Sequence, residues 1–216
     1  MDGGRPAGAE HGRRGGPVGG TADGDGNGSA GGVGGVRYAV GRVTAEELPG
    51  AAEELAALLA DTVRGGASLG FLAPLERAEA VAWWRALAPD LETGRLLLWT
   101  VRAVDGGRLA GTVQLRPAAT ANGRHRGEVA KLMVHPEHRG QRLAGRLLAA
   151  LEEQAGELGL RLLVLDTQTG SPAERMYEAG GWTRVGSVPD YATDPAGVPH
   201  PTTIFFKALG GGPAVS

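Results

Sequence analysis

One segment constrains the fold of this chain more than any other, because it joins a strand to a long helix through a short basic turn. Residues 128–134 read as a strand that His135-Pro136 ends, and a helix follows from about Gly140 to Leu158. Four leucines at helical spacing give that helix one apolar side: Leu143, Leu147, Leu148 and Leu151. The segment predicts a domain in which helices cover a sheet.

The turn between this strand and helix has the chemistry of a phosphate site. A helix start exposes unpaired backbone N–H groups and the positive end of the helix dipole. Small residues let a phosphate approach that backbone, and neighbouring arginines add positive charge. Taken alone, the turn also fits an ordinary helix start with solvated arginines, because glycine-containing turns are common. Its residues are Arg139, Gly140, Gln141, Arg142, Leu143, Ala144, Gly145 and Arg146.

The first elements of the domain are a strand and a helix. Residues 36–43 read as the strand. Thr44 and Glu47 have the spacing of a capping box, in which each side chain bonds the backbone N–H of the other. The helix that follows has an apolar stripe and ends at Gly65-Gly66, the stripe being formed by Leu48, Leu55, Leu58 and Leu59.

A second helix and a hairpin lead up to the central segment. The helix is expected over residues 74–91, with Val81, Trp84 and Leu87 on its inner face. Strands at 96–104 and 109–116 follow. Asp105-Gly106-Gly107 joins them, because Asp-Gly supplies the positive φ angles of a tight turn.

The C-terminal elements are a strand, a helix and two further strands. Residues 161–165 form a nearly continuous apolar strand of the kind buried in a sheet centre. Ser171-Pro172-Ala173-Glu174 is a strong helix start, with an N-cap serine and proline at the first helical position. Strands at 182–185 and 202–207 complete the order. That order indicates a mixed α/β fold.

Composition narrows the function classes. The chain has 216 residues and a formal net charge of -2, so nothing draws it globally to nucleic acid or to an anionic membrane. It contains no cysteine, which excludes disulfides, thiolate metal sites and a cysteine nucleophile. No apolar run of roughly 20 residues and no signal-peptide core is present, so we expect a cytoplasmic protein. The excess of alanine, glycine and arginine over lysine and asparagine suggests a GC-rich bacterial genome.

Glycine-rich ends flank the domain. Residues 1–35 contain little that could offset the entropy of ordering so many glycines, and we expect a disordered tail. Its arginines lack the interleaved aromatics of a nucleic-acid-binding arm. Residues 210–216 form a second short tail. The domain is therefore expected at 36–209.

With these elements in place, the chain resembles the GNAT superfamily of N-acetyltransferases. The superfamily hallmark is Arg or Gln, two residues, Gly, one residue, then Gly or Ala, between a strand and a helix. Arg139 and Ala144 match its ends, and Arg142 stands at its middle glycine. An arginine is compatible there if its φ is negative. The resemblance implies the GNAT fold, a mixed, mostly antiparallel sheet of about seven strands with helices on both faces.

Further motifs are similar to the branch that contains the tabtoxin-resistance acetyltransferase. They cover nearly all of residues 37–209 and include Leu165-Asp166-Thr167, Gly170-Ser171, Tyr177, Pro189-Asp190-Tyr191, His200-Pro201-Thr202 and Lys131-Leu132-Met133-Val134. The resemblance implies direct attack of an acceptor amine on acetyl-CoA, without an acyl-enzyme. A small amino-acid-like, antibiotic or toxin amine is the expected acceptor. A protein or peptide acetyltransferase and a non-catalytic acyl-CoA sensor are the alternatives, and the chain is expected to be a monomer or homodimer.

The resemblance also implies roles for individual residues. Leu132, Met133 and Val134 would bind the pantetheine arm through their backbone, with the turn at 139–146 and Ser171 completing the acetyl-CoA site. Tyr177 would protonate the departing thiolate, and the alternative for it is a core tyrosine. Asp166 is the first candidate for the base or for orienting the acceptor ammonium, Glu128 is its rival, and water is the third possibility.

The acceptor pocket is expected beside the first two helices. Ser68, Phe71 and Trp83 would line it together with Asp166. Trp83 and the adjacent Trp84 cannot share one helix face, so one of them is expected in the core. His135, His138 and His200 lack metal-ligand spacing. We therefore predict no metal, and turn or phosphate-edge roles for these histidines.

Overall fold

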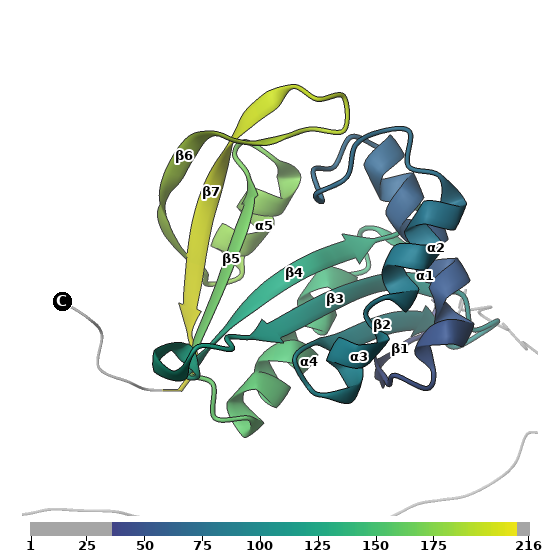
Figure 1. Ribbon diagram of the computed structural model, residues 1–216, viewed down its shortest axis with the longest axis horizontal. Helices are drawn as coiled ribbons and strands as arrows, with labels where there is room; N and C mark the ends of the chain where they lie inside the picture. The colour runs from purple at the N-terminus through teal and green to yellow at the C-terminus, as the bar shows by residue number, and fades with distance from the viewer. Residues whose placement is uncertain (1–35, 211–216) are drawn as a thin grey trace, which may run out of the picture. The chain divides into compact units, whose positions relative to one another are not determined.

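A computed structural model describes residues 36–210 as one seven-stranded sheet with helices on both faces (Figure 1). The strand order is β1-β2-β3-β4-β5-β7-β6. Within this part of the chain only β4 and β5 pair in parallel, as the mixed, mostly antiparallel sheet requires. The predicted tail at 1–35 and residues 211–216 of the second tail lie outside the described residues.

The first half of the sheet is an antiparallel meander. β1 spans Tyr38–Val43, β2 Leu97–Ala103 and β3 Leu109–Pro117. The turn between β2 and β3 has positive φ at Gly106 and Gly107, as its sequence predicts. A short 3-10 turn, Ala121–Gly123, leads from β3 to β4.

The helices on one face follow the predicted pattern with one difference. α1 spans Leu48–Arg64, and both predicted bonds of the capping box form between Thr44 and Glu47. The single helix expected at 74–91 is wrong, because it is divided into α2, Arg77–Arg85, and α3, Ala88–Glu92. Pro89 lies in the first turn of α3 and has no N–H to continue the α2 ladder.

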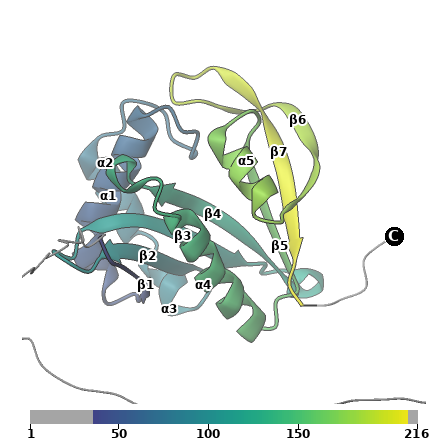
Figure 2. The same cartoon turned by 180° about the vertical axis from the view of Figure 1, so that it is seen from behind.

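The other face carries the two helices that follow β4 and β5. β4 spans Arg126–Val134, and a 3-10 turn, Pro136–His138, leads to α4, Leu143–Glu157. Seen from behind, α4 crosses in front of β2, β3 and β4 (Figure 2). The C-terminal elements are β5, Leu162–Gln168; α5, Pro172–Ala179; β6, Thr183–Thr193; and β7, Pro199–Ala208.

Two apolar layers hold the helices to the sheet. Between the sheet and α1–α3, the layer includes Leu55, Leu59 and Trp84, all fully buried. On the α4 side it includes all four leucines predicted to face inward, together with Val113, Leu163 and Phe205. No helix within residues 36–210 is both long enough and apolar enough to cross a membrane.

Candidate active site

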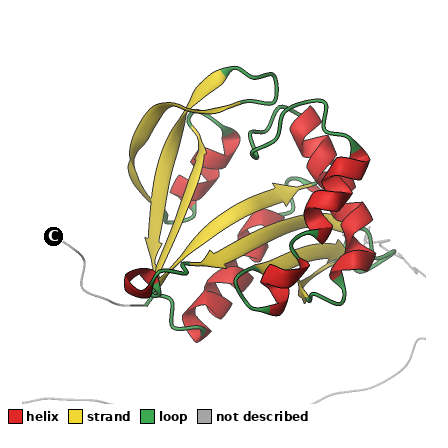
Figure 3. Cartoon of the chain, in the orientation of Figure 1, coloured by secondary structure: helices red, strands yellow, loops and turns green. Residues whose placement is uncertain are grey.

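The site is built where the two parallel strands separate. β4 and β5 pair only from Arg126–Leu162 to Glu128–Val164. Beyond these residues β4 bends toward α1 and α2, and β5 continues beside β7, so the strands diverge (Figure 3). Backbone groups on the facing edges of both strands are thereby freed from the sheet at its centre. This opening is the natural place for an extended ligand, which could bond to strand edges.

A bulge in β4 lies at this opening. Gln114 pairs with Ala130 and Thr112 with Met133, so β4 has one residue more than β3 between these pairs. Lys131, one of the two β4 residues opposite Val113, has φ 52°, a left-handed conformation that is rare for residues other than glycine. The bulge was not predicted from the sequence. The run Leu132-Met133-Val134 does not signal it, because a strand covered on both faces reads as a continuous apolar run.

The bulge divides the residues predicted to bind pantetheine between the two sides of the sheet. Met133 is buried with the α1–α3 layer, whereas Leu132 and Val134 pack against the α4 layer. Met133 and Val134 pair with Thr112 and Gly111 of β3, so only the edge of β4 away from β3 faces the opening. The binding of pantetheine by these three residues stays a prediction.

The start of α4 is left open to solvent. No side chain caps the helix, and Gly140, Gly145 and Arg142 are all exposed. A methyl group added at Gly140 or Gly145 would meet nothing within 4 Å, so there is space above this backbone for a bulky anion. Arg139 is exposed beside it. Unpaired N–H groups, space and positive charge together fit a pyrophosphate.

Arg142 departs from the expectation for its backbone. We expected a negative φ for an arginine at this position. Its φ is 56° and its ψ 24°, so this expectation is wrong. The chain must turn sharply from the 3-10 turn into α4, and the left-handed residue makes that turn, as a glycine would. Gly140, with φ 77°, makes a similar bend two residues earlier. Arg146 points elsewhere and donates to the Tyr38 carbonyl at 2.8 Å.

Tyr177 lies on α5 with its ring in the α4-side core. It is buried and contacts Trp182 and Phe205, at ring-centroid distances of 5.7 and 6.1 Å. Burial, with a smaller contribution from the Asp166 charge, raises the pKa of its phenol. The phenol therefore stays protonated over the physiological range and is able to donate a proton. Both roles expected from the sequence, core packing and acid, are compatible with this position.

The carboxylates named as candidate bases lie on the two strands that diverge. Glu128 ends the paired part of β4, and Asp166 lies on β5 two residues beyond Val164. Asp166 does not end its strand, as the sequence suggested, because β5 continues to Gln168. Asp166 is exposed, and the partial loss of solvent around its carboxyl raises the pKa of that group, while the Lys131 charge opposes the shift. A raised pKa makes Asp166 a stronger base than an ordinary aspartate.

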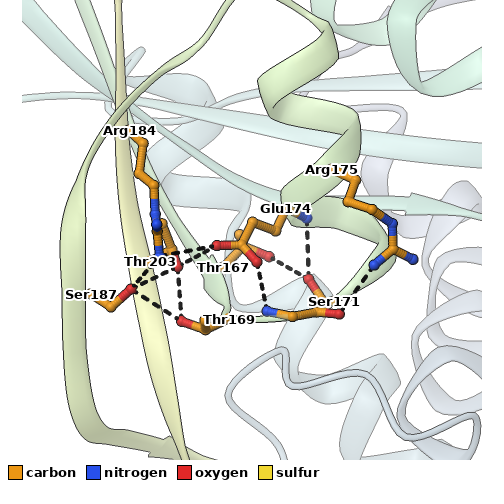
Figure 4. A network of polar contacts seen from close by, with 9 residues as sticks. Thr167, Thr169, Ser171, Glu174, Arg175, Arg184, Ser187 and Thr203 are labelled. Atoms are coloured by element: carbon orange, nitrogen blue, oxygen red, sulfur yellow. Dashed lines mark hydrogen bonds and ion pairs between the residues drawn. The ribbon is translucent and has the colours of Figure 1, made fainter.

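The start of α5 is closed by a polar network (Figure 4). Ser171, predicted to bind acetyl-CoA, caps the helix by accepting from the Glu174 N–H at 3.2 Å. The Glu174 carboxylate is buried and accepts from the Gly170 N–H and the Thr203 hydroxyl, each at 2.6 Å. These bonds hold the pKa of Glu174 below its ordinary value, the Thr203 bond having the largest effect. The network fixes α5 to β7 and so positions Tyr177.

Of the predicted acceptor residues, Ser68 and Phe71 lie in the α1–α2 loop, Trp83 lies on α2 and Asp166 lies on β5. Phe71 and Trp83 pack edge to face with ring centroids 5.2 Å apart, and both are half-buried. Trp84 is in the core, as expected for one of the adjacent tryptophans. The Nζ of Lys131 lies 5.7 Å from the Trp83 ring centroid, which brings the α2 wall and the β4 bulge together.

Two hydrogen bonds, called the loop–hairpin bridge below, join the α1–α2 loop to the turn between β6 and β7. The Ser68 hydroxyl donates to the Thr193 carbonyl at 2.9 Å, and the Ala73 N–H donates to the Pro195 carbonyl at 2.8 Å. The bridge spans the end of the molecule toward which β4 and β5 diverge (Figure 1). Ser68 is thus engaged with backbone, while Phe71 and Trp83 remain as the aromatic wall.

The three histidines have local roles in turns. His200 Nε2 lies 3.0 Å from Asp194, whose carboxylate also accepts two N–H bonds in the β6–β7 turn. His135 accepts from the Glu137 N–H, and His138 bonds Tyr38. Among residues 36–210, no group of three His, Asp or Glu side chains could hold a metal ion.

Comparison with known proteins places this geometry in a family. The model of the Acetyltransferase (GNAT) family matches residues 63–182, more than half of the chain. Mycothiol acetyltransferase of Kineococcus radiotolerans is 40% identical over 80 residues, which are 37% of this chain and 25% of that protein. The match thus spans only a quarter of that relative's length.

Solved structures share the fold. An N-acetyltransferase from Staphylococcus aureus Mu50 aligns with a TM-score of 0.66 at 15% identity, over 81% of this chain and 99% of that one. A Salmonella typhimurium protein, solved with its cofactor acetyl-CoA, aligns with a TM-score of 0.64 at 17% identity, over 82% and 96%. At such identities these likenesses show a common fold and leave the acceptor open.

Proposed function

Because the chain belongs to the acetyltransferase (GNAT) family, we propose that it transfers the acetyl group of acetyl-CoA to the amine of a small acceptor molecule. The observation that carries this proposal is the opening between β4 and β5, with a bulge that frees the backbone of β4. The uncapped start of α4 lies at the end of the same strand. Strand edge and helix start together offer one extended ligand a place for its amide-containing arm and for its pyrophosphate.

The chain's own residues fit acetyl-CoA at both ends of this site. The exposed N–H groups around Gly140 and Gly145 would bind the pyrophosphate, with Arg139 adding charge. The backbone of Leu132, Met133 and Val134 would bind the pantetheine arm. When bound, acetyl-CoA supplies an activated acetyl thioester. One of the β4 N–H groups would then stabilise the negative charge that develops on the carbonyl oxygen.

Proton transfer is assigned to residues on both sides of the opening. Asp166, with its raised pKa, would accept the proton of the acceptor ammonium. Glu128 is the alternative base. Tyr177, which stays protonated, would donate to the thiolate that leaves. Direct attack is consistent with a sequence that lacks cysteine.

The loop–hairpin bridge supports a small acceptor. It joins the loop that carries Phe71 to the β6–β7 turn. An extended polypeptide acceptor would have to pass around this connection or displace it. The similarity to the tabtoxin-resistance branch also favours an amino-acid-like, antibiotic or toxin amine. A protein substrate and a non-catalytic sensor are the competing functions.

The test is release of free thiol from acetyl-CoA with a panel of small amines, peptides and proteins. We expect release to depend on a small amine and to fall roughly 100-fold in Tyr177→Phe, as for loss of a general acid. Asp166→Asn and Glu128→Gln identify the base. If Asp166 is the base, kcat/KM falls on acidification through a pKa above the ordinary 3.8 of aspartate, and only Asp166→Asn removes that limb.

Three outcomes would contradict the proposal. Transfer to proteins but not to small amines would favour the second function. Tight binding of acetyl-CoA without transfer to any acceptor would favour the sensor. Failure to bind acetyl-CoA would show that the assignment of residues 139–146 is wrong.

A further inference from the structure

The sequence contains two lysines, and the structure places both beside tryptophans. The Nζ of Lys131 lies 5.7 Å from the ring centroid of Trp83, and that of Lys207 lies 5.9 Å from the ring centroid of Trp182. Both lysines are half-buried. The pair therefore offers an internal comparison, in which aromatic contact and burial are similar and the remaining partners differ.

Lys207 has a complete set of partners. Its Nζ donates to both carboxylate oxygens of Glu152, at 2.8 and 2.9 Å, and to the Gly180 carbonyl at 3.2 Å. A partly buried ammonium needs such partners, because leaving water without compensation is costly. This lysine shows what a structural lysine looks like in this fold.

Lys131 lacks those partners. Among residues 36–210, no carboxylate oxygen lies within 4.0 Å of its Nζ, and no hydrogen bond from it is formed. Its left-handed backbone in the β4 bulge directs the side chain to the aromatic wall of the acceptor region. Burial lowers the pKa of Lys131, Arg116 lowers it further, and Asp166 and Glu128 oppose the shift. The ammonium is thus held near two carboxylates without contacting either.

A second unpartnered donor lies on the neighbouring strand. Gln114 pairs with Ala130, the residue before Lys131, and its side chain is 1% exposed. Its Nε2 has no hydrogen-bond partner in the described part of the chain. Buried donors in folded proteins are nearly always satisfied, so Gln114 and Lys131 are both donors without an acceptor beside the bulge; Trp84 Nε1 is a further one among the described residues.

We propose that Lys131 is a specificity-determining residue of the acceptor site and binds a carboxylate that the acceptor carries close to its reacting amine. The inference rests on the proposed function. The acceptor's ammonium would lie toward Asp166 and Glu128, and its carboxylate toward Lys131, so a zwitterion would complete the unpaired charges on both sides of the opening. Trp83 would hold the lysine in place through its contact with Nζ.

The local charge favours a carboxylate over a phosphate monoester. Arg116 adds positive charge near Lys131, but its guanidinium is already paired with Asp90 at 3.1 Å. One free ammonium neutralises a singly charged carboxylate, whereas a dianion would retain a negative charge facing Asp166 and Glu128. Repulsion between that remaining charge and the two carboxylates would disfavour binding of the dianion.

The test compares matched acceptors in matched variants. Kinetics of thiol release are measured with a panel of free amino acids and with the corresponding amino-acid amides, which keep the amine and lose the carboxylate. The proteins are the full chain, Lys131→Met, Lys131→Arg and, as control, Lys207→Met. Thermal melting of each variant establishes that it is folded.

We expect the full chain to prefer amino acids over their amides by about tenfold or more in kcat/KM, as for a charge-assisted hydrogen bond. Lys131→Met should remove that preference, mainly by raising KM for the amino acid, and Lys131→Arg should restore part of it. Lys207→Met should keep the preference even if its melting temperature falls. A preference that survives in Lys131→Met, or an equal loss for both acceptor types, would overturn the proposal.

A binding measurement separates this proposal from the proposed function. N-acetylated amino acids, which are the expected products, and their amides are titrated calorimetrically into the full chain and Lys131→Met without acetyl-CoA. Tighter binding of the carboxylates to the full chain alone supports Lys131 even if no amine is acetylated. Equal binding of carboxylates and amides to the full chain overturns the proposal even if transfer is observed.

Discussion

The starts of α4 and α5 occupy equivalent places in this domain but are built in opposite ways. Both helices follow a strand at the centre of the sheet, and both begin close to the opening between β4 and β5. α5 begins with a serine cap and a buried glutamate that bonds the preceding loop and β7. α4 begins with a left-handed arginine, no side-chain cap and two open glycines.

This difference suits the start of α4 to binding a ligand and the start of α5 to holding the fold together. An uncapped helix start loses about 1 kcal/mol relative to a capped one, so the open start of α4 is a cost to folding. The N–H groups at the start of α4 therefore stay available to bind an anion, whereas N–H groups at the start of α5 already bond to side chains of the protein. The capped start of α5 instead holds Tyr177 in a fixed position. Four predictions test this division, and we describe them from the largest expected effect to the smallest.

Closing the start of α4 should remove donor binding without harming the fold. Gly145→Glu puts an acid at the third position of the helix, where glycine is a poor helix former and a negative charge is favourable. We expect stability to rise by about 1 kcal/mol. Affinity for acetyl-CoA should fall roughly 10- to 100-fold, because the carboxylate would repel the pyrophosphate. Calorimetric titration and thermal melting measure the two effects.

The matched control makes the same change at the other end of the helix. Gly156 also lies in α4 with open space around it, but in the last turn, where an acid opposes the dipole. Gly156→Glu should leave acetyl-CoA affinity unchanged. Equal loss of affinity in both variants would mean that the α4 start is not the pyrophosphate site.

Opening the start of α5 should weaken the fold more than donor binding. Glu174→Ala leaves the Gly170 N–H and the Thr203 hydroxyl without their partner, and we expect a loss of about 2–3 kcal/mol in unfolding free energy. Glu178→Ala, an exposed position on the same helix, is the control and should change it by less than about 0.5 kcal/mol. Denaturant unfolding measures both. A loss no larger than that of the control would show that the network is not structural.

Glu174 also makes the stability of the fold depend on pH. Its folded pKa lies below the ordinary 4.5, so its stabilising contribution is present above that value and is lost as the pH falls through the folded pKa. In Glu174→Gln that part of the acid-induced loss should be absent. Stability curves at a series of pH values, for the two proteins side by side, measure the difference.

The smallest expected effect comes from the left-handed arginine. Arg142→Gly should stabilise the fold by about 1 kcal/mol, because glycine adopts positive φ without strain. Gly140→Ala, the reverse change two residues away, should destabilise it by a similar amount. Thermal melting of both variants measures this. If both variants melt at the same temperature as the full chain, the left-handed bends are not maintained in solution.

Local sequence patterns predicted much of the secondary structure on which this comparison rests. The Ser171 cap predicted where α5 begins, and the leucine spacing after the basic turn predicted the buried side of α4. The capping box of Thr44 and Glu47 forms just before α1, but α4 begins at Leu143 and not near Gly140 as predicted. The family resemblance, rather than periodicity, supplied the mixed, mostly antiparallel sheet of about seven strands. Pro89 could have warned of the break between α2 and α3, because proline prefers a first helical turn.

Features that depend on long-range geometry were not predicted. Nothing in the neighbourhood of Lys131 or Arg142 requires a left-handed residue, and each conformation follows from how strands and helices meet. The bond between Ser68 and Thr193 joins residues 125 positions apart, and no local pattern encodes it. The Glu174–Thr203 bond is similar, since the helix start was predicted but not its partner on β7.

The loop–hairpin bridge also has a consequence for the order of events in time. Its two halves leave the ribosome more than a hundred residues apart, and contacts of such separation form late in folding. α4 and the strands before it are complete long before the β6–β7 turn is synthesised. A growing chain thus acquires the start of α4 before the loop–hairpin bridge can form. In the finished protein the bridge includes two hydrogen bonds between surface segments, and connections of this kind open locally without unfolding of the domain.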